Sequence, residues 1–176
     1  MILTGVSAHI QSSIVLEFCH NRRKVVYIEY YKIREEALAP RRANPSDAGM
    51  DLAFSPEDGE AITIEPGGSV ICGTGLKFGV PHGYMLQVMN RSSIAAKRSL
   101  VVGAHVVDAG YNGEVFINLH NIGTEAQTVE PGTRIAQGVI IPVISARPVE
   151  YELDELYSRA YTNSNRGDGA LGSTDG

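Results

Sequence analysis

Short apolar stretches alternate with glycine- and proline-containing turns along most of the chain. Six stretches rich in β-branched and aromatic residues are typical of strands; they cover residues 24–33, 61–64, 69–80, 84–89, 114–121 and 138–144. Four intervening segments have the composition of turns: "EPGG" (65–68), "VPHG" (80–83), "YNGE" (111–114) and "VEPGT" (129–133). This alternation predicts an all-β fold, a jelly roll or distorted β-barrel.

One segment predicts a helix. In "RSSIAAKRSL" (91–100), serine precedes a run of good helix formers, which predicts an N-capped helix of about two or three turns. No long helical pattern separates the strand candidates, so a parallel α/β fold is disfavoured.

Composition narrows the function classes. The chain has 176 residues, 43% of them hydrophobic and 20% charged, which indicates one globular domain. A net charge of −5 argues against general binding to nucleic acid or anionic membranes. No apolar run approaches the roughly 20 residues of a membrane helix. Cys19 and Cys72 form no metal-binding spacing. We therefore expect a reducing compartment, the cytoplasm, or the host cytoplasm if the source is a virus.

The pattern also predicts three regions along the chain. Residues 1–23 break the strand–turn alternation and are expected to form an appended, poorly ordered extension, or alternatively an added edge strand. Residues 24–160 are the expected β domain. Residues 161–176 form a glycine-rich tail, whose composition alone favours a frayed end.

Five segments combine polar residues with glycine: "DAGMDL" (47–52), "NRSSIAAK" (90–97), "VVDAGYNGE" (106–114), "RIAQGVI" (134–140) and "RGDGALGST" (166–174). In this order and spacing they resemble the five motifs of the trimeric dUTPase family. The resemblance implies a jelly-roll homotrimer that uses Mg²⁺ to hydrolyse dUTP to dUMP and pyrophosphate. It also implies that three subunits build each active site.

The third segment carries the candidate catalytic residue. From the residues alone, Asp108 before Ala109 and Gly110 suits a tight turn, and a partly buried carboxylate also suits a general base. The resemblance makes Asp108 the catalytic aspartate, which activates the water that attacks the α-phosphorus. It also implies that Tyr111 packs on the deoxyribose and excludes a 2′-hydroxyl. It implies that Val106, Val107 and Phe116 bind the substrate.

The other segments carry candidate phosphate and metal contacts. Serines at a helix start suit an anion site, although a plain N-cap explains them equally well. The resemblance assigns Arg91, Ser92 and Ser93 to the substrate, with Ser92 near the α–β bridge. It places Gln137 near the α-phosphate and lets Asp51 meet Mg²⁺ through water.

In the family, the last segment closes over a neighbouring subunit's site, so the tail is expected to be such an arm. The resemblance implies that Arg166 pairs with the γ-phosphate, because a planar guanidinium binds phosphate through two hydrogen bonds. It implies that Ser173 and Thr174 donate further hydrogen bonds. Leu171 and Gly172 would cover the base.

Three positions differ from the family pattern. Leu171 replaces the usual aromatic ring over uracil, Val102 replaces a common asparagine, and His105 replaces a common glycine. These differences leave a shifted preference, for dCTP or for several deoxynucleotides, as an alternative.

The residues disfavour three other functions for a chain of this fold. The related dCTP deaminases need a glutamate where Asn118 stands and an arginine where Ala96 stands, so deamination is disfavoured. A non-catalytic regulator with a dUTPase-like fold is disfavoured by the presence of Asp108, Tyr111 and Arg166. A structural jelly roll, such as a capsid protein, would not need these motifs in register.

Overall fold

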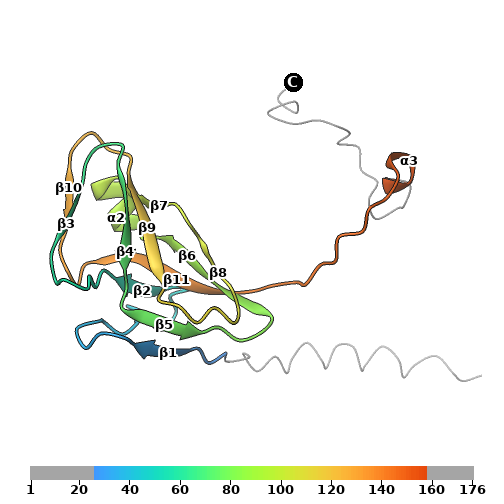
Figure 1. Cartoon of the computed structure of the whole chain (residues 1–176), viewed down its shortest axis with the longest axis horizontal. Coiled ribbons are helices and arrows are strands. Elements are labelled where there is room, and N and C mark those ends of the chain that lie inside the picture. The colour runs from blue at the N-terminus through green and yellow to red at the C-terminus, as the bar shows by residue number, and fades with distance from the viewer. Residues whose placement is uncertain (1–25, 158–176) are drawn as a thin grey trace, which may run out of the picture. The chain divides into compact units, whose positions relative to one another are not determined.

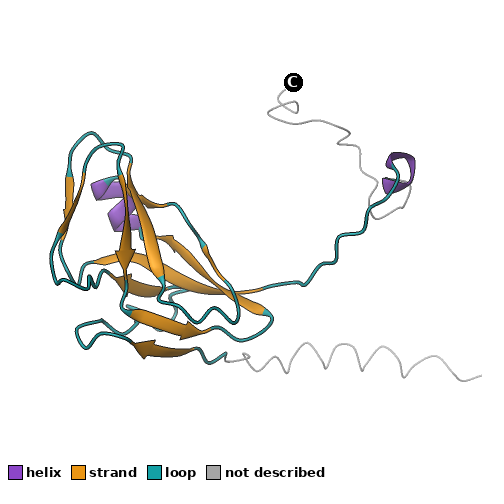
Figure 2. Ribbon diagram, viewed as in Figure 1, coloured by secondary structure: helices purple, strands orange, loops and turns teal. Residues whose placement is uncertain are grey.

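The computed structural model describes residues 26–157, and within them residues 26–143 form small antiparallel sheets around one core (Figures 1 and 2). The elements in chain order are β1 (Glu29–Lys32), β2 (Met50–Ala53), β3 (Ile62–Ile64), β4 (Ser69–Gly73), β5 (Leu76–Gly79), β6 (Tyr84–Asn90), α2 (Ser92–Arg98), β7 (Leu100–Val102), β8 (Val106–Val107), β9 (Phe116–Asn121), β10 (Gln127–Val129), β11 (Arg134–Pro142) and α3 (Leu153–Leu156). The predicted all-β jelly-roll class with one short helix in the domain is confirmed.

Two larger sheets enclose the core. One has the strand order β2-β11-β6-β8 and the other β4-β9-β7, while β1 pairs with β5 and β10 with β3. All of these pairings are antiparallel. The most buried large side chains come from both larger sheets and their flanks: Leu52, Ile64, Leu76, Leu86, Leu100, Ile117, Leu119 and Ile135. Burial of these apolar side chains is the main force that holds the sheets together.

Strand β9 shows how alternation sets the two faces of a sheet. Ile117, Leu119 and Asn121 are buried, whereas Phe116 is exposed and the side chains at 118 and 120 are half-buried. Successive side chains of a strand point to opposite faces, so Phe116, Asn118 and His120 share the outer face of the β4-β9-β7 sheet.

The strand predictions are largely confirmed, with shifted ends. The predicted strand 69–80 is two strands, because the chain bends at Thr74 and Gly75, where Gly75 has a φ of +67°. Strands β2, β7, β8 and β10 were not predicted. They are two to four residues long, and β2 lies within the polar, glycine-containing segment 47–52.

Three of the four predicted turns are present. Main-chain hydrogen bonds join Gly68 N to Glu65 O, Tyr84 N to Pro81 O and Thr133 N to Glu130 O. The fourth was predicted at 111–114, but the turn closes earlier, where Tyr111 N donates to Asp108 O (3.2 Å). Gly110, at a φ of +85°, allows that earlier turn.

The predicted serine N-cap is wrong. The helix spans Ser92–Arg98 and its N-cap is Arg91, whose backbone is extended and whose side chain makes no capping hydrogen bond. The Arg91 side chain is instead held by β2 and β11, and its carbonyl accepts the first helical hydrogen bonds from Ile94 N and Ala95 N. Ser92 is therefore the first helical residue.

The chain divides into two compact units, the first ending at Val143 and the second beginning at Ile144. Within the second unit, an extended stretch precedes the single turn of α3. The predicted domain boundaries, at 23/24 and 160/161, lie outside the described residues. No helix within residues 26–157 is long and apolar enough to cross a membrane.

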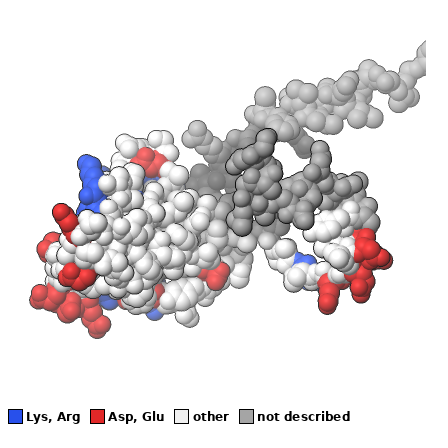
Figure 3. All heavy atoms as spheres, turned by 90° about the horizontal axis from the view of Figure 1, so that it is seen from above, with Lys and Arg blue, Asp and Glu red and all other residues white. Residues whose placement is uncertain are grey.

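The surface charge agrees with the acidic composition. On the face shown in Figure 3, the described Lys and Arg side chains form only small, separate groups, and acidic side chains gather nearby. That face carries no continuous basic surface of the kind that binds nucleic acid.

Asn121 provides a test of the polar contacts in the core. Its side chain is 1% exposed, donates to Ile64 O and Glu125 O, and accepts from Gly123 N. We expect Asn121→Ala to lower the free energy of unfolding by about 3 kcal/mol, because three buried groups lose their partner. Urea unfolding measures this. The control Thr124→Ala, at an exposed site in the same loop, should change stability by less than about 0.5 kcal/mol. Equal effects would contradict the assigned role.

Candidate functional site

The hairpin between β8 and β9 carries Asp108 and Tyr111. Tyr111 is 45% exposed, and its hydroxyl donates to Glu114 O (3.0 Å), so the ring lies across the hairpin. A Cβ at Gly113 would lie 2.3 Å from the Tyr111 hydroxyl oxygen, so this position requires glycine. Asp108 is exposed at the start of the turn. The hairpin therefore presents a carboxylate beside a fixed aromatic ring.

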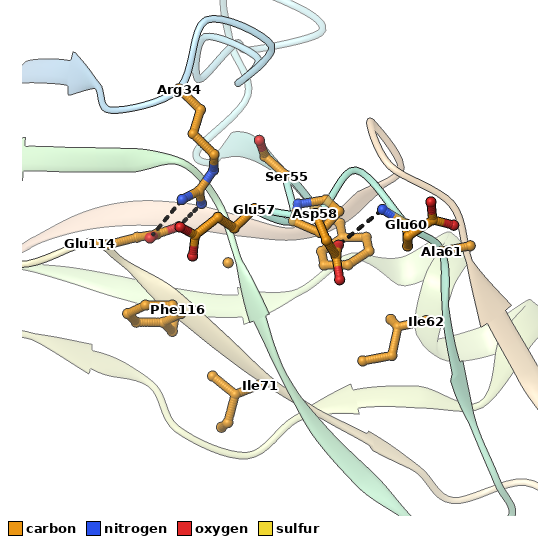
Figure 4. Close-up of a pocket in the computed structure, with 13 residues that line it drawn as sticks. Arg34, Ser55, Glu57, Asp58, Glu60, Ala61, Ile62, Ile71, Glu114 and Phe116 are labelled. Atoms are coloured by element: carbon orange, nitrogen blue, oxygen red, sulfur yellow. Dashed lines mark hydrogen bonds and ion pairs between the residues drawn. The ribbon is translucent and has the colours of Figure 1, made fainter.

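The base of this hairpin is fixed by Glu114. The Glu114 carboxylate accepts a hydrogen bond from Gly75 N (2.7 Å) and forms an ion pair with both terminal nitrogens of Arg34 (Figure 4). Both side chains are mostly buried, with 11% and 17% exposed. Thr74 Oγ1 also donates to Val115 O (2.7 Å). These contacts anchor the hairpin to the bend between β4 and β5.

A cavity of about 560 Å³ adjoins this ion pair. Figure 4 shows Arg34 and Glu114 at one side of it, with Glu57 drawn beside them, and the acidic side chains Asp58 and Glu60 at the other side. These carboxylates disfavour a polyanion in this cavity. A second cavity, of about 430 Å³, is lined by the hairpin tip together with β1 and β5.

A second set of predicted residues meets on strands β2 and β11 and at the end of β6. The Asp51 carboxylate lies 2.7 Å from Arg91 Nε and 3.6 Å from Arg134 Nε. Arg91 Nη1 also donates to Arg134 O (2.7 Å). Three segments far apart in the sequence thus form one charged cluster.

Gln137 completes this cluster. In the pairing of β11 with β2, Gln137 lies opposite Asp51. Its Nε2 donates to Asn90 O (2.9 Å), and Asn90 directly precedes Arg91. A Cβ at Gly49 would lie 2.2 Å from Gln137 Oε1, so glycine is required for this packing. We call these residues the arginine cluster: Asp51, Arg91, Arg134 and Gln137, together with Ser92 and Ser93, which are exposed at the adjoining helix start.

The hairpin and the arginine cluster lie at opposite edges of the β2-β11-β6-β8 sheet. Asp51 is at the level of Met89, and Val107 at the level of Leu86. Across the sheet, three strand spacings of about 4.8 Å lie between the two edge strands. Along the strands, Asp108 is one residue beyond Val107 and therefore four residues from the level of Asp51, at about 3.3 Å per residue. Together these offsets separate Asp108 from Asp51 by roughly 20 Å. One chain therefore does not bring the two groups together.

The remaining predicted residues have different positions. Val106 is 59% exposed and Val107 half-buried in β8, and Phe116 is 51% exposed at the start of β9. Arg166, Leu171, Gly172, Ser173 and Thr174 lie outside the described residues. Their assigned roles stay predictions.

The chain offers few ligands for a resident metal ion. Within residues 26–157, no three His, Cys, Asp or Glu side chains gather closely enough to hold one. The Asp51 carboxylate already faces two arginines. Burial raises the pKa of the Cys72 thiol to about 11, so this cysteine stays protonated and is no nucleophile.

Sequence reasoning missed the Arg34–Glu114 pair and the close packing at Gly49. Arg34 and Glu114 are 80 positions apart, and no local pattern marks such a pair. An acidic residue directly after the glycine of a hairpin was the available signal for Glu114.

Comparison with known proteins shows which family the chain resembles. A family model described as dUTPase matches residues 35–175. A deoxyuridine 5'-triphosphate nucleotidohydrolase from Rhizobium leguminosarum bv. trifolii is 39% identical over 77% of this chain and 83% of its own. One from Clostridium acetobutylicum is 41% identical over 85% of this chain and 97% of its own.

The fold has a close counterpart among solved structures. A variant dUTPase of Staphylococcus bacteriophage 80alpha, solved with dUpNHpp, superposes with a TM-score of 0.72 at 25% identity. The match covers 85% of this chain and 99% of the phage protein.

The Glu114 anchor gives a stability prediction. We expect Glu114→Ala to lower the free energy of unfolding by about 3 kcal/mol, because Arg34 loses its counter-charge in a mostly buried position. Glu114→Gln keeps an acceptor for Gly75 N and should lower the free energy of unfolding by less than Glu114→Ala. Urea unfolding of both variants, beside the exposed control Glu35→Ala, measures the difference. A loss no larger than that of the control would contradict the anchoring role.

Proposed function

Because this chain belongs to the dUTPase family, we propose that it hydrolyses dUTP to dUMP and pyrophosphate by attack of water on the α-phosphate. The observation that carries this proposal is the arginine cluster. Residues from three matching segments meet there beside a serine-bearing helix start. The reaction removes dUTP from the nucleotide pool and yields dUMP.

In this proposal, Asp108 takes the proton from the attacking water. Its exposed position at the end of β8 gives it access to a water molecule and to a bound nucleotide. The Tyr111 ring, fixed by its hydrogen bond to Glu114 O, packs against the deoxyribose and leaves no space for a 2′-hydroxyl. Val106, Val107 and Phe116 flank the base.

The arginine cluster would bind the phosphates. Ser92 and Ser93 offer hydroxyl and main-chain donors near the α- and β-phosphates, and the amide of Gln137 lies next to them. Donors at the bridging oxygen stabilise the charge that develops on the pyrophosphate leaving group. The side chain of Arg91 orients Asp51 and the end of β6 and adds positive charge.

We further propose that Mg²⁺ enters as a chelate of the triphosphate, since Mg²⁺ prefers phosphate oxygens and keeps several waters. When bound, it would neutralise charge on the phosphates. In this proposal Asp51 would meet the water shell of the ion while it stays paired with Arg91 and Arg134. One carboxylate suits a metal ion that arrives with the substrate better than a resident ion.

The separation of roughly 20 Å between Asp108 and Asp51 supports a site shared between chains. We propose a homotrimer, in which the hairpin of one copy faces the arginine cluster of a second copy. The tail of a third copy would contribute Arg166, Leu171, Gly172, Ser173 and Thr174 over the nucleotide. Arg166 would pair with the γ-phosphate.

A panel of deoxynucleoside triphosphates tests the activity. We expect pyrophosphate release from dUTP to exceed that from dCTP and dTTP, and Asp108→Asn to abolish it while nucleotide binding is kept. Pyrophosphate-coupled assays and calorimetric titration with a non-hydrolysable dUTP analogue measure these properties. Near-normal turnover by Asp108→Asn would remove this carboxylate from the mechanism. Equal rates on all nucleotides would refute the substrate assignment.

Mixing two variants tests the shared site. Asp108→Asn and Ser92→Ala, each inactive or nearly so, should regain about a quarter of wild-type activity after unfolding together and refolding, because random mixing unites both intact groups at one site in four. Refolding each variant alone provides the control. If activity stays at the level of the separate variants, both groups act within one chain.

A further inference from the structure

The two arms of the Asp108 hairpin diverge at Gly103 and Asn118. Gly103 N donates to Asn118 O (2.9 Å), and from there β8 pairs with β6, whereas β9 continues along β4. The hairpin thus joins two different sheets (Figure 1). Its arms run apart from Gly103 and meet again at the Asp108 turn.

The inner edge of the β9 arm offers free main-chain groups. The carbonyl of Asn118 faces β7, and main-chain groups two residues apart in a strand face the same side. The N–H and C=O of Phe116 therefore face the space between the arms. Strand β7 pairs with β9 only from Leu119 onward, so within the described chain no strand pairs with Phe116 on this side.

A polar pair lies where the arms diverge. His120 Nε2 and Asn118 Oδ1 are 2.5 Å apart, and both side chains are half-buried on the outer face of the sheet. With the amide oxygen as acceptor, the imidazole donates from Nε2. In this orientation the amide keeps its NH₂ group as a further donor.

Gly103 makes room for this pair. A Cβ at this position would lie 2.2 Å from both Asn118 Oδ1 and His120 Nε2. A larger residue at position 103 would therefore displace the ends of these two side chains from their present contact.

The pair also lies at a suitable distance from the sugar position. The Tyr111 hydroxyl bonds to Glu114 O, four residues before Asn118. Four extended residues span about 13 Å, which exceeds a nucleoside alone but is of the order of a nucleoside together with the amide side chain that would meet its base. A nucleoside with its sugar on Tyr111 and its base between the arms would direct the far edge of the base toward Asn118.

We propose that Asn118, oriented by His120, reads the 4-position of the pyrimidine and selects an oxo group over an amino group. This inference rests on the proposed function and names its specificity residue. Uracil and thymine carry an acceptor at this position, whereas cytosine carries an NH₂ donor. An amide that presents NH₂ pairs with the acceptor and opposes the donor. Because an amide cannot relay protons, Asn118 selects the base and does not deaminate it.

The ratio of kcat/KM for dUTP to kcat/KM for dCTP tests the proposal. This ratio is independent of the fraction of folded enzyme, so a merely structural defect does not change it. We expect Asn118→Asp to lower the ratio at least about tenfold, because a carboxylate repels the oxo group and accepts from the amino group. His120→Phe should lower the ratio several-fold, because the amide is then free to rotate. The ratio of dUTP to dTTP should stay constant in both variants, since both bases carry the oxo group.

The matched control is Asn112→Asp, which adds the same charge at an exposed position of the same hairpin and should keep the dUTP/dCTP ratio within about twofold. If Asn118→Asp does not fold, Asn118→Ser should lower the ratio in the same direction by a smaller factor. An unchanged ratio in an Asn118 variant of an enzyme that prefers dUTP overturns the inference alone. An unchanged ratio in His120→Phe overturns the orienting role. A wild-type enzyme without preference for dUTP overturns the proposed function as well.

Discussion

The ion pair between Arg34 and Glu114 is the contact on which the hairpin geometry depends. It joins the loop after β1, the bend between β4 and β5, and the hairpin that carries Asp108 and Tyr111. The Glu114 side chain pairs with Arg34 and Gly75 N beside a cavity, while its carbonyl accepts from Tyr111. One residue thus links the bend between β4 and β5 to the ring that would meet the sugar. Since the pair is mostly buried, loss of either charge would leave the other without compensation.

The distance between Asp51 and Asp108 is the second constraint. Strands β2 and β11 and the end of β6 carry the arginine cluster, while Asp108 follows β8, at the edge of the sheet opposite β2. Within a single chain these groups are separated by roughly 20 Å. Chemistry that needs both must therefore join two surfaces, and the sheet acts as a rigid spacer between them.

Much of the fold could be predicted from local pattern. Stretches rich in β-branched and aromatic residues identified β6, β9 and β11, and glycine with proline identified the turns at Gly68, Gly83 and Gly132. Strands β2, β7, β8 and β10 were missed because runs of two to four residues carry little signal, although β3, of similar length, was predicted. The helix start was misplaced because a distant aspartate holds the Arg91 side chain, and local capping preference does not reveal such a contact. The segments of the arginine cluster were recognised from sequence, but the pairs Arg34–Glu114 and Asn118–His120 require the three-dimensional arrangement.

The close packing at Gly103 has an evolutionary consequence. A side chain added there would displace the amide and the imidazole at positions 118 and 120 from their contact. These three positions are therefore expected to covary during divergence: lineages that acquire a larger residue at 103 would first, or simultaneously, acquire smaller ones at the other two. Reconstructed ancestral sequences would then show glycine at position 103 before, or together with, the amide at position 118 and the imidazole at position 120.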